Sequence, residues 1–565
     1  MLSTRDILNM KNENKQCQKC KNNFVIEQDD FSFYEKMKVP VPKICPDCRF
    51  KMKALWRNEM SLYSGQKCGL CGKEIITIYN PKNNFKVLCY KCFFSDTWNP
   101  RDYATDYNLE KSFFSQFLDI FKKVPKKNLS IDLSSGPIIN TEYANMAGGM
   151  KNCYMVFNGG DGEEMMYCRG IMKGKEISDC YFGENIDLSY ECVNTNRSSG
   201  IIFGKNVLSC VDSQFLLNCS GLTNCFGCVN LRNKSNCWFN QQLTHEEYVK
   251  KLGDVIGNYF ILEEQKIRFH EFCLQFPHRE NNNIKIMDCI GDYLFESKNI
   301  KDSFEITESE NCKYVCYTKK TKDSLGVIGF GIKSEQLLEV VSTGYSSNVL
   351  CSNAIDGSQN IMYSNSLHNC TDCIGCDGLK NAKYCILNKQ YTKEEYEKIK
   401  DHIIKELTEK GIHGLMMPPE IAPFAYNETI AQDNMPLTKE EAIAQGFRWE
   451  DDIQMTKGKE TLKPEDIPDH IKDVTDSITG EILKCINCER NYKITEQELL
   501  FYRKMILPIP RKCFFCRHRD RIIRRGPFKF FTRKCSYCGK DTHTNLTEEV
   551  APIMYCEKCY QQEVI

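Results

Sequence analysis

The sequence has few of the features that mark enzymes, membrane proteins or secreted proteins. Only nine of its 565 residues are histidine. No two histidines have the spacing of a metal pair, no Ser/His/Asp order stands out, and no glycine-rich phosphate-binding loop is present. No apolar run approaches the roughly 20 residues that cross a bilayer, and Met1 to Lys15 are too polar for a signal peptide. We therefore expect a cytoplasmic chain without membrane contacts, and an enzyme is the least favoured class of function.

Cysteine, in contrast, is abundant, with 34 residues. Sixteen of them form Cys-x2-Cys pairs, four pairs near each end of the chain. The intervals between successive pairs are 24, 19 and 17 residues in the first set and 24, 18 and 17 in the second. Neighbouring residues recur as well: Phe33 and Tyr34 return as Phe501 and Tyr502. The chain therefore carries the same module twice.

Two Cys-x2-Cys pairs can place four sulfurs around one point, which is the tetrahedral site that Zn2+ prefers. We predict two zinc ions in each module and four in the chain, in closed sites that are structural rather than catalytic. Sequential pairing is the simpler arrangement, and cross-braced pairing is the alternative. Disulfides are not expected, because nothing else in the chain indicates secretion. The predicted ligands are Cys17, Cys20, Cys45, Cys48, Cys68, Cys71, Cys89, Cys92, Cys485, Cys488, Cys513, Cys516, Cys535, Cys538, Cys556 and Cys559.

The middle of the chain, residues 135–390, consists of short extended pieces separated by Asn, Asp, Gly and Ser, with isolated cysteines. It is also duplicated, because residues 225–248 align without gaps to residues 373–396. We predict a right-handed β-solenoid in which stacked coils bury the small cysteine side chains. An irregular β-sandwich is the alternative. Each half ends in a helix with a capping box that begins at Thr244 or Thr392 and could close the last coil.

A short run in the second half, Cys370, Cys373 and Cys376 with Cys385 nearby, has a spacing similar to that of an iron–sulfur motif. In the first half Leu222 takes the place of Cys370. Buried structural thiols are therefore favoured here, and an additional zinc site or a cluster stays open.

The predicted fold class is mainly β with short helices, in which two duplicated tetracysteine zinc-binding modules of the treble-clef or zinc-ribbon type flank a duplicated, right-handed solenoid-like middle. The predicted boundaries are 1–98 for the N-terminal module, 99–134 for a helical connector, 135–242 for the first solenoid half, 243–285 for a capping helix and connector, 286–390 for the second half, 391–410 for its capping helix, 411–480 for a linker with a small folded patch, and 481–565 for the C-terminal module.

The net charge of zero conceals an uneven distribution. Residues 1–98 and 481–565 each hold 17 Lys and Arg against 10 Asp and Glu, whereas the rest holds 41 against 55. Much of the basic charge lies in a helix-like stretch after the second Cys pair of each module. We expect its apolar side chains to pack on the module and its charged side chains to point outward. The residues predicted to contact nucleic acid are Arg49, Lys51, Lys53, Arg57, Arg517, Arg519, Arg521, Arg524 and Arg525.

These patterns favour a non-enzymatic, zinc-binding protein that contacts nucleic acid, preferably RNA or a ribonucleoprotein, through the basic helices of its two modules. The alternative is a scaffold or adaptor for protein partners, or a self-assembling structural protein. The sequence does not predict the oligomeric state.

Several segments also resemble a known family. The run from Phe33 to Pro42, the following Cys45-Pro-Asp-Cys-Arg49, and the stretches 225–234 and 426–429 are similar to a widespread family of uncharacterised zinc-ribbon proteins from candidate-phylum bacteria. The resemblance implies metal binding and no established activity. Members are sometimes labelled CaiB/BaiF-type CoA-transferases, but this sequence has no Rossmann-type glycine fingerprint and no carboxylate nucleophile in context. Cys513-Phe-Phe-Cys516 lacks the Pro that is common in the family, although its ligands are intact.

Overall fold

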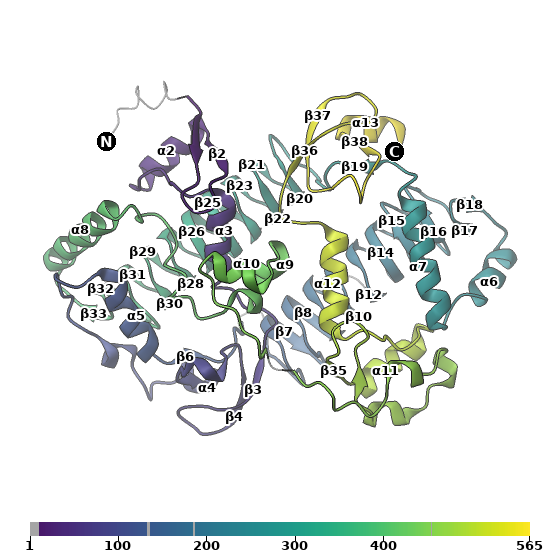
Figure 1. Ribbon diagram of the computed structural model, residues 1–565, viewed down its shortest axis with the longest axis horizontal. Helices are drawn as coiled ribbons and strands as arrows, with labels where there is room; N and C mark the ends of the chain where they lie inside the picture. Colours follow the sequence, from purple (N-terminus) through teal and green to yellow (C-terminus); the bar gives the residue numbers. More distant parts are fainter. Residues whose placement is uncertain (1–10, 133–135, 185–186, 454) are drawn as a thin grey trace. The chain divides into compact units, whose positions relative to one another are not determined.

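The chain folds into two compact units, each built from two separate segments (Figure 1). Unit 1 combines Met1–Asn128 with Asn281–Asp451, and unit 2 combines Leu129–Glu280 with Asp452–Ile565. Each unit thus joins one terminal module to the solenoid half that lies farther from it along the chain. The computed structural model describes residues 11–132, 136–184, 187–453 and 455–565. The first ten residues of the predicted N-terminal module and residues 133–134 of the predicted connector lie outside these ranges.

Both halves of the β-solenoid are present, and together they have about 20 turns. Successive strands pair in parallel, and most residues pair with the residue 12 positions further on, as Ile201 does with Ser213 and Thr371 with Lys383. Parallel pairing at one fixed offset is the pattern of stacked coils, so the alternative of an irregular β-sandwich is wrong. The handedness of the solenoid stays a prediction.

Most strands of the solenoid have only about four residues, because each coil turns a corner after a short extended piece. Half 1 contains β7 (Asn145–Lys151), β8 (Phe157–Met166), β9 (Arg169–Met172), β10 (Lys175–Ser178), β11 (Tyr181–Glu184), β12 (Asp187–Tyr190), β13 (Val193–Asn196), β14 (Ser199–Leu208), β15 (Val211–Leu217), β16 (Phe226–Val229), β17 (Cys237–Trp238) and β18 (Gln241–Gln242). Half 2 contains β20 (Gly291–Phe295), β21 (Lys298–Lys301), β22 (Ser303–Thr307), β23 (Glu310–Lys313), β24 (Cys316–Lys319), β25 (Thr321–Ile332), β26 (Ser334–Gly344), β27 (Ser347–Leu350), β28 (Asn353–Asp356), β29 (Gln359–Met362), β30 (Asn365–His368), β31 (Thr371–Ile374), β32 (Lys383–Ile386) and β33 (Lys389–Gln390).

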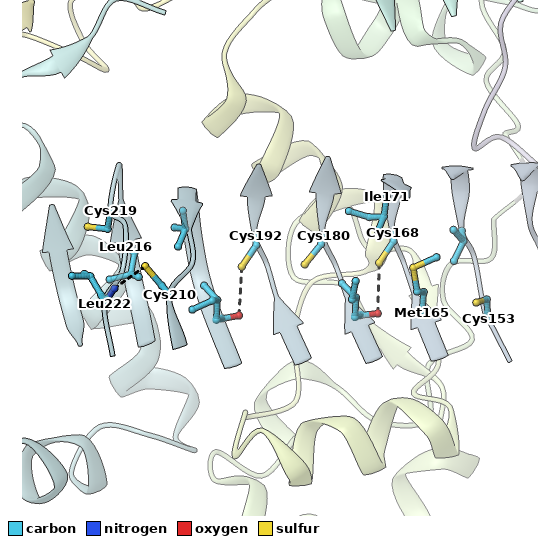
Figure 2. Packing of buried hydrophobic residues seen from close by; sticks show 14 of the residues in the cluster. Cys153, Met165, Cys168, Ile171, Cys180, Cys192, Cys210, Leu216, Cys219 and Leu222 are labelled. Atoms are coloured by element: carbon cyan, nitrogen blue, oxygen red, sulfur yellow. Dashed lines mark hydrogen bonds between the residues drawn. The ribbon is translucent and has the colours of Figure 1, made fainter. Parts of the chain in front are cut away.

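A three-residue repeat builds each coil. One residue of the triplet adopts a left-handed backbone, and the side chain that follows points into the coil; Asp179, with φ of 55°, and the buried Cys180 are an example. Figure 2 shows the result in half 1, where Cys168, Cys180 and Cys192 lie directly before the neighbouring strands β9, β11 and β13 and face the same interior. The prediction that small cysteine side chains occupy inward positions is confirmed.

Asparagine side chains form ladders along the outside of the coils. The Asn194 amide donates to Asn206 Oδ1 at 3.0 Å, and the Asn206 amide donates to Asn218 Oδ1 at 3.1 Å. All three residues have positive φ, and asparagine tolerates this conformation better than most residues do. The same amino acid therefore suits the left-handed backbone at these positions and links one coil to the next.

Each half is closed by the predicted capping helix, α6 (His245–Gly253) in half 1 and α8 (Lys393–Glu409) in half 2. Both helices have the expected capping box, with Thr244 and Thr392 as N-caps. In each half the last parallel strand also pairs with a short antiparallel strand, β18 or β33. This pairing and the helix protect an edge that would otherwise be open to other chains.

The two modules repeat the same order of elements. In each module the first and third Cys-x2-Cys pairs lie in turns between two strands, and the second and fourth pairs begin a helix. The N-terminal module contains β1 (Glu13–Gln16), β2 (Asn23–Ile26), α2 (Gln28–Lys36), α3 (Pro46–Ala54), β3 (Tyr63–Lys67), β4 (Glu74–Thr77), β5 (Val87–Leu88) and α4 (Tyr90–Phe93). The C-terminal module contains β34 (Leu483–Lys484), β35 (Asn491–Tyr492), α11 (Glu496–Lys504), α12 (Phe514–Arg525), β36 (Phe531–Lys534), β37 (Asp541–Thr544), β38 (Met554–Tyr555) and α13 (Glu557–Glu563). The connecting segments contribute α5 (Phe113–Lys123), β6 (Lys126–Lys127), α7 (Tyr259–Cys273), β19 (His278–Arg279), α9 (Ile430–Asn434) and α10 (Lys439–Ala444).

Candidate metal centres

The sixteen predicted ligands gather into four groups of four sulfurs, and within each group all ligand atoms lie within 4.8 Å of one another. The groups follow the order of the chain, so the sequential pairing is confirmed and the cross-braced alternative is wrong. Every cysteine in the described ranges is a free thiol. The groups are Cys17, Cys20, Cys45 and Cys48; Cys68, Cys71, Cys89 and Cys92; Cys485, Cys488, Cys513 and Cys516; and Cys535, Cys538, Cys556 and Cys559.

The spacing within each group fits one tetrahedral metal ion. Four sulfurs at about 2.3 Å from a single Zn2+ would lie about 3.8 Å from one another. The sulfurs of Cys20 and Cys45 are 3.6 Å apart, and the equivalent distances in the other three groups are 3.9, 3.6 and 3.8 Å. Because four protein ligands complete the tetrahedron, no position is left for a substrate.

The third ligand of every group is the N-cap of a helix, as Cys45 is for α3 and Cys513 for α12. Its backbone N–H donates to the first sulfur of the group, for example from Cys45 to Cys17 Sγ at 3.3 Å. Burial alone would raise the pKa of Cys17, but backbone N–H donors lower it to about 6, and the same holds for Cys68 and Cys535. Helix N-termini and these donors thus favour the thiolate that a metal requires.

The solenoid cysteines have a different role. In the described part of the chain they form no further group with the geometry of a metal site. Their thiols donate instead to backbone carbonyls, as Cys168 does to Met166 at 3.1 Å and to Ile177 at 3.6 Å, the second of which is drawn in Figure 2. Cys370 repeats this pattern with the carbonyls two residues before it and nine residues after it. These contacts support the interpretation of the middle cysteines as buried structural thiols.

The basic residues after the second Cys pair of the N-terminal module face half 2 of the solenoid. Arg49 and Lys53 are four residues apart on α3, which places them on one face of the helix, and Arg57 follows shortly after the helix ends; each of the three is at most 3% exposed. Glu339 on β26 pairs with both Arg49, at 2.9 Å, and Lys53, at 2.7 Å. Arg57 donates to the Ser342 hydroxyl at 2.8 Å. The charged row is therefore an internal contact between module and solenoid.

The C-terminal module repeats this contact on half 1. Arg517, Arg521 and Arg525 have the same four-residue spacing, and each is at most 3% exposed. Asp179 Oδ1 accepts hydrogen bonds from both Arg517 and Arg521 at 3.0 Å. Glu191, one coil further on, pairs with Arg521 at 3.2 Å. On the solenoid side, unit 2 thus places two carboxylates where unit 1 uses Glu339 alone, and Glu498 of the module also lies 3.7 Å from Arg517.

The fit between helix and solenoid follows from their dimensions. Four residues of an α-helix rise about 6 Å, and adjacent coils are separated by about 4.8 Å. A row of basic residues at four-residue spacing therefore meets approximately one coil with each step. In half 1 these coils present Tyr167, Asp179 and Glu191, which are 12 residues apart and all have positive φ. The aromatic ring also takes part, because the Arg517 guanidinium lies 5.1 Å from the ring centre of Tyr167.

This placement contradicts the expectation that the basic side chains point outward toward phosphate. The reason is that the solenoid supplies buried carboxylates in register with each helix, so that the charged face of the helix docks on the solenoid. Ile523, which we expected to pack inward, is 64% exposed. Three of the predicted contacts differ: Lys51 donates to Gln445 at 2.8 Å, Arg524 pairs with Glu191 at 2.8 Å, and Arg519 is exposed. The six buried residues are Arg49, Lys53, Arg57, Arg517, Arg521 and Arg525.

Sequence reasoning missed the solenoid carboxylates Asp179, Glu191 and Glu339. The signal that could have revealed them is the triplet repeat. When the middle of the chain is written in rows of 12, Asp179 and Glu191 fall in one column, immediately before the inward-facing Cys180 and Cys192. Acidic residues in such a column, with a basic row at four-residue spacing elsewhere in the chain, predict a docking contact.

Neither models of known protein families nor curated protein sequences gave a match to this chain. The resemblance of the cysteine modules to a zinc-ribbon family therefore stays a prediction. Within the described ranges, no helix combines the length and the apolar character needed to cross a membrane.

Proposed function

We propose that the chain is a non-enzymatic zinc protein that serves as a binding scaffold. In this proposal four Zn2+ ions fold the two modules, and each module braces one half of the solenoid. The observation that carries it is the buried basic row of each module, which ends on Glu339 in unit 1 and on Asp179 and Glu191 in unit 2. Because its charges are used for docking, each helix holds its solenoid half in place. The solenoid then offers a long, rigid and polar β-surface to a partner.

Zinc is the metal that the donor set supports best. Four thiolates in a tetrahedron suit Zn2+ or an iron–sulfur centre, and a site closed by four protein ligands supplies folding energy rather than catalysis. The residues that would hold the ions are the four groups of four cysteines described above. Each bound ion would carry the charge of its site to about −2, and the helix N-cap beside it stabilises that charge.

Metal analysis of the purified chain tests the cofactor. We expect four zinc ions per chain and no iron. Removal of zinc by a chelator should increase hydrogen exchange in α3 and α12, and also in the solenoid strands that they cover, because module and solenoid form one contact. Iron in place of zinc would contradict the cofactor, and unchanged exchange in the covered strands after complete metal loss would contradict the brace.

Native purification from the source cell tests the scaffold. The extract is divided into nuclease-treated and untreated halves, and a metal-stripped chain serves as the matched control. A macromolecular partner that is retained by the zinc-loaded chain and lost by the stripped chain supports a scaffold. A protein that survives nuclease and high salt would make it a protein scaffold. Turnover of a small molecule with no retained macromolecule would contradict the proposal.

A further inference from the structure

The segment around the second metal centre of the N-terminal module has an excess of positive side chains that the duplicate segment lacks. Residues 63–98, which contain this centre, hold five Lys and Arg against two Asp and Glu. The equivalent residues 530–565 hold four against five. A bound Zn2+ with four thiolates would add about −2 to both. The difference between the copies therefore lies in their surfaces and not in their metal ligands.

The helix that begins at each centre shows the same contrast. In α4 and its C-cap the residues around the last ligand include Tyr90, Lys91 and Phe94, whereas α13 has Glu557 and Gln561 in place of Tyr90 and Phe94. Glu557 is also engaged, because it pairs with Arg279 at 2.5 Å. The duplicate is therefore acidic and bound to its own unit at the position where the N-terminal copy is aromatic.

Tyr90 and Phe94 lie together at the surface of unit 1. The rings of Tyr90 and Phe94 are 4.7 Å apart between centres, and Phe94 is 37% exposed. Two ammonium groups lie over the Phe94 ring, Lys380 at 4.8 Å and Lys127 at 5.7 Å from its centre. Lys380 is held in place, because it donates to the Phe93 carbonyl at 2.9 Å. Solvent-facing rings are here surrounded by positive charge.

Lysines of the adjoining segments extend this charge. Four of them are exposed and form no ion pair with any described residue: Lys86, Lys91, Lys122 and Lys123. Lys91 belongs to α4, Lys86 directly precedes β5, and Lys122 and Lys123 end α5, which leads into the β6 strand that pairs with β5. The buried row of α3, in contrast, has all of its charges facing the solenoid. These four lysines add exposed positive charge to the segments that adjoin the second centre.

We propose that this face, defined by Tyr90, Lys91, Phe94, Lys127 and Lys380, binds single-stranded nucleic acid. Unpaired bases stack on the rings of Tyr90 and Phe94, and the lysines contact the phosphates. Exposed rings beside a positive groove or face are the combination by which proteins hold single strands without reading their sequence. A duplex offers no free base faces, so it cannot use the rings. The proposal requires only that the second centre is folded and does not depend on the scaffold role.

Binding of fluorescent 20-nucleotide single-stranded RNA, single-stranded DNA and duplex DNA to the full-length, zinc-loaded chain tests this inference. We expect both single strands to bind more tightly than the duplex, and the tighter of the two identifies the natural sugar. Phe94→Ala should weaken binding about 10-fold, since stacking on one ring contributes this order of magnitude. Lys91→Glu should weaken binding and reduce the slope of log affinity against log salt by about 0.7, the value for one phosphate on a single strand.

The duplicated module supplies the matched control. Lys558 is the equivalent of Lys91, so Lys558→Glu changes the same charge at the other centre and should leave binding unchanged. Zinc content of each variant confirms that both centres are folded. Equal losses from Lys91→Glu and Lys558→Glu, or unchanged affinity of Phe94→Ala, would overturn the proposal. Competition by poly-glutamate as strong as that by the oligonucleotide, with no effect of Phe94→Ala, would assign the face to an acidic protein and also overturn it.

Discussion

The two units use the same helix face to dock on the solenoid, but they balance its charge differently. In unit 1 Glu339 alone serves Arg49 and Lys53. In unit 2 Asp179 and Glu191 share Arg517 and Arg521. Duplication has thus preserved the geometry of the contact while the number of carboxylates has changed. The comparison teaches that the row of basic residues defines where the helix docks. The stability of this contact depends on which solenoid residues lie opposite the row.

The pKa values of the equivalent cations Lys53 and Arg521 shift in opposite directions. Burial lowers the pKa of Lys53; Glu339 raises it and Arg49 lowers it further, and the net direction is down. Burial also acts to lower the pKa of Arg521, but Glu191 and Asp179 outweigh it, and the net direction is up. Arg49 shares Glu339 with Lys53 and yet has a raised pKa, so the direction of the shift depends on the type of cation and its other neighbours as well as on the number of carboxylates.

The largest expected effect comes from removing one ligand of the first centre in either module. Cys48→Ser and Cys516→Ser should each release one zinc ion and unfold the helix that carries the docking row, because structural zinc contributes about 10–16 kcal/mol of apparent binding free energy. Zinc content and hydrogen exchange, measured together, check this. We expect exposure of α3 only in the first variant and of α12 only in the second; exposure of both helices in either variant would contradict independent bracing.

Loss of a docking carboxylate should affect the two units to different extents. Glu339→Gln leaves two buried cations without their anion and should destabilise the docking of α3 by about 3–5 kcal/mol, the typical cost of breaking a buried pair. Glu191→Gln is its counterpart, and we expect a smaller loss of about 1–3 kcal/mol because Asp179 still accepts from Arg517 and Arg521. The free energies of local opening follow from hydrogen exchange in α3 and α12. Equal losses would show that the second carboxylate adds nothing.

Gly326 marks the position where the two columns differ. It lies one coil before Glu339, as Asp179 lies one coil before Glu191. An added Cβ would approach Glu339 Oε1 and Lys53 Nζ to 2.6 Å. Gly326→Ala should therefore destabilise unit 1 by about 1–3 kcal/mol through crowding, in addition to the cost of its φ of +69°.

Gly65→Ala is the control for this variant, because Gly65 has a φ of +78° and no neighbouring atom within 4 Å of the added Cβ. Its thermal unfolding reports the backbone cost alone. A destabilisation by Gly326→Ala no greater than that by Gly65→Ala would mean that Glu339 and Lys53 move aside without cost.

The smallest effect is expected in the asparagine ladders. Asn206→Ala interrupts the ladder of half 1 and should cost about 1 kcal/mol, the usual contribution of a hydrogen bond. Asn360→Ala in half 2 should cost somewhat more, because the Asn360 amide donates at 2.9 Å to the carboxylate of Asp372, and charged acceptors form stronger bonds. Urea unfolding of both variants measures the difference in stability. A larger loss for Asn206→Ala than for Asn360→Ala would show that the charge of Asp372 does not strengthen the bond.

The metal centres could be predicted from the sequence because each depends on local spacing. A Cys-x2-Cys turn brings its own sulfurs together, so only the pairing of the turns had to be inferred. The solenoid was accessible through its duplication and through the inward cysteines, although its 12-residue period was hidden by an 11-residue and a 13-residue step in half 2, seen at Ile284–Phe295 and Leu325–Leu338.

The docking of the basic helices could not be predicted in the same way, because the two partners are far apart in the chain. Arg49 and Glu339 are separated by 290 residues, and nothing near Arg49 indicates that a carboxylate will cover it. A basic helix at the end of a chain has the same local pattern whether it faces solvent or a buried acid. Only the pairing of each module with the distant half decides between these outcomes.

The pairing of each module with the distant half has a consequence for the order of synthesis. The N-terminal module is complete at about residue 98, but Glu339 follows only after about 240 more residues, which takes roughly 12–50 s at 5–20 residues per second. Half 1, with Asp179 and Glu191, is made in the meantime. The first docking surface that the completed N-terminal module meets is therefore that of half 1, on which it does not dock in the finished protein. Folding of this chain must include either a delay or an exchange of partners.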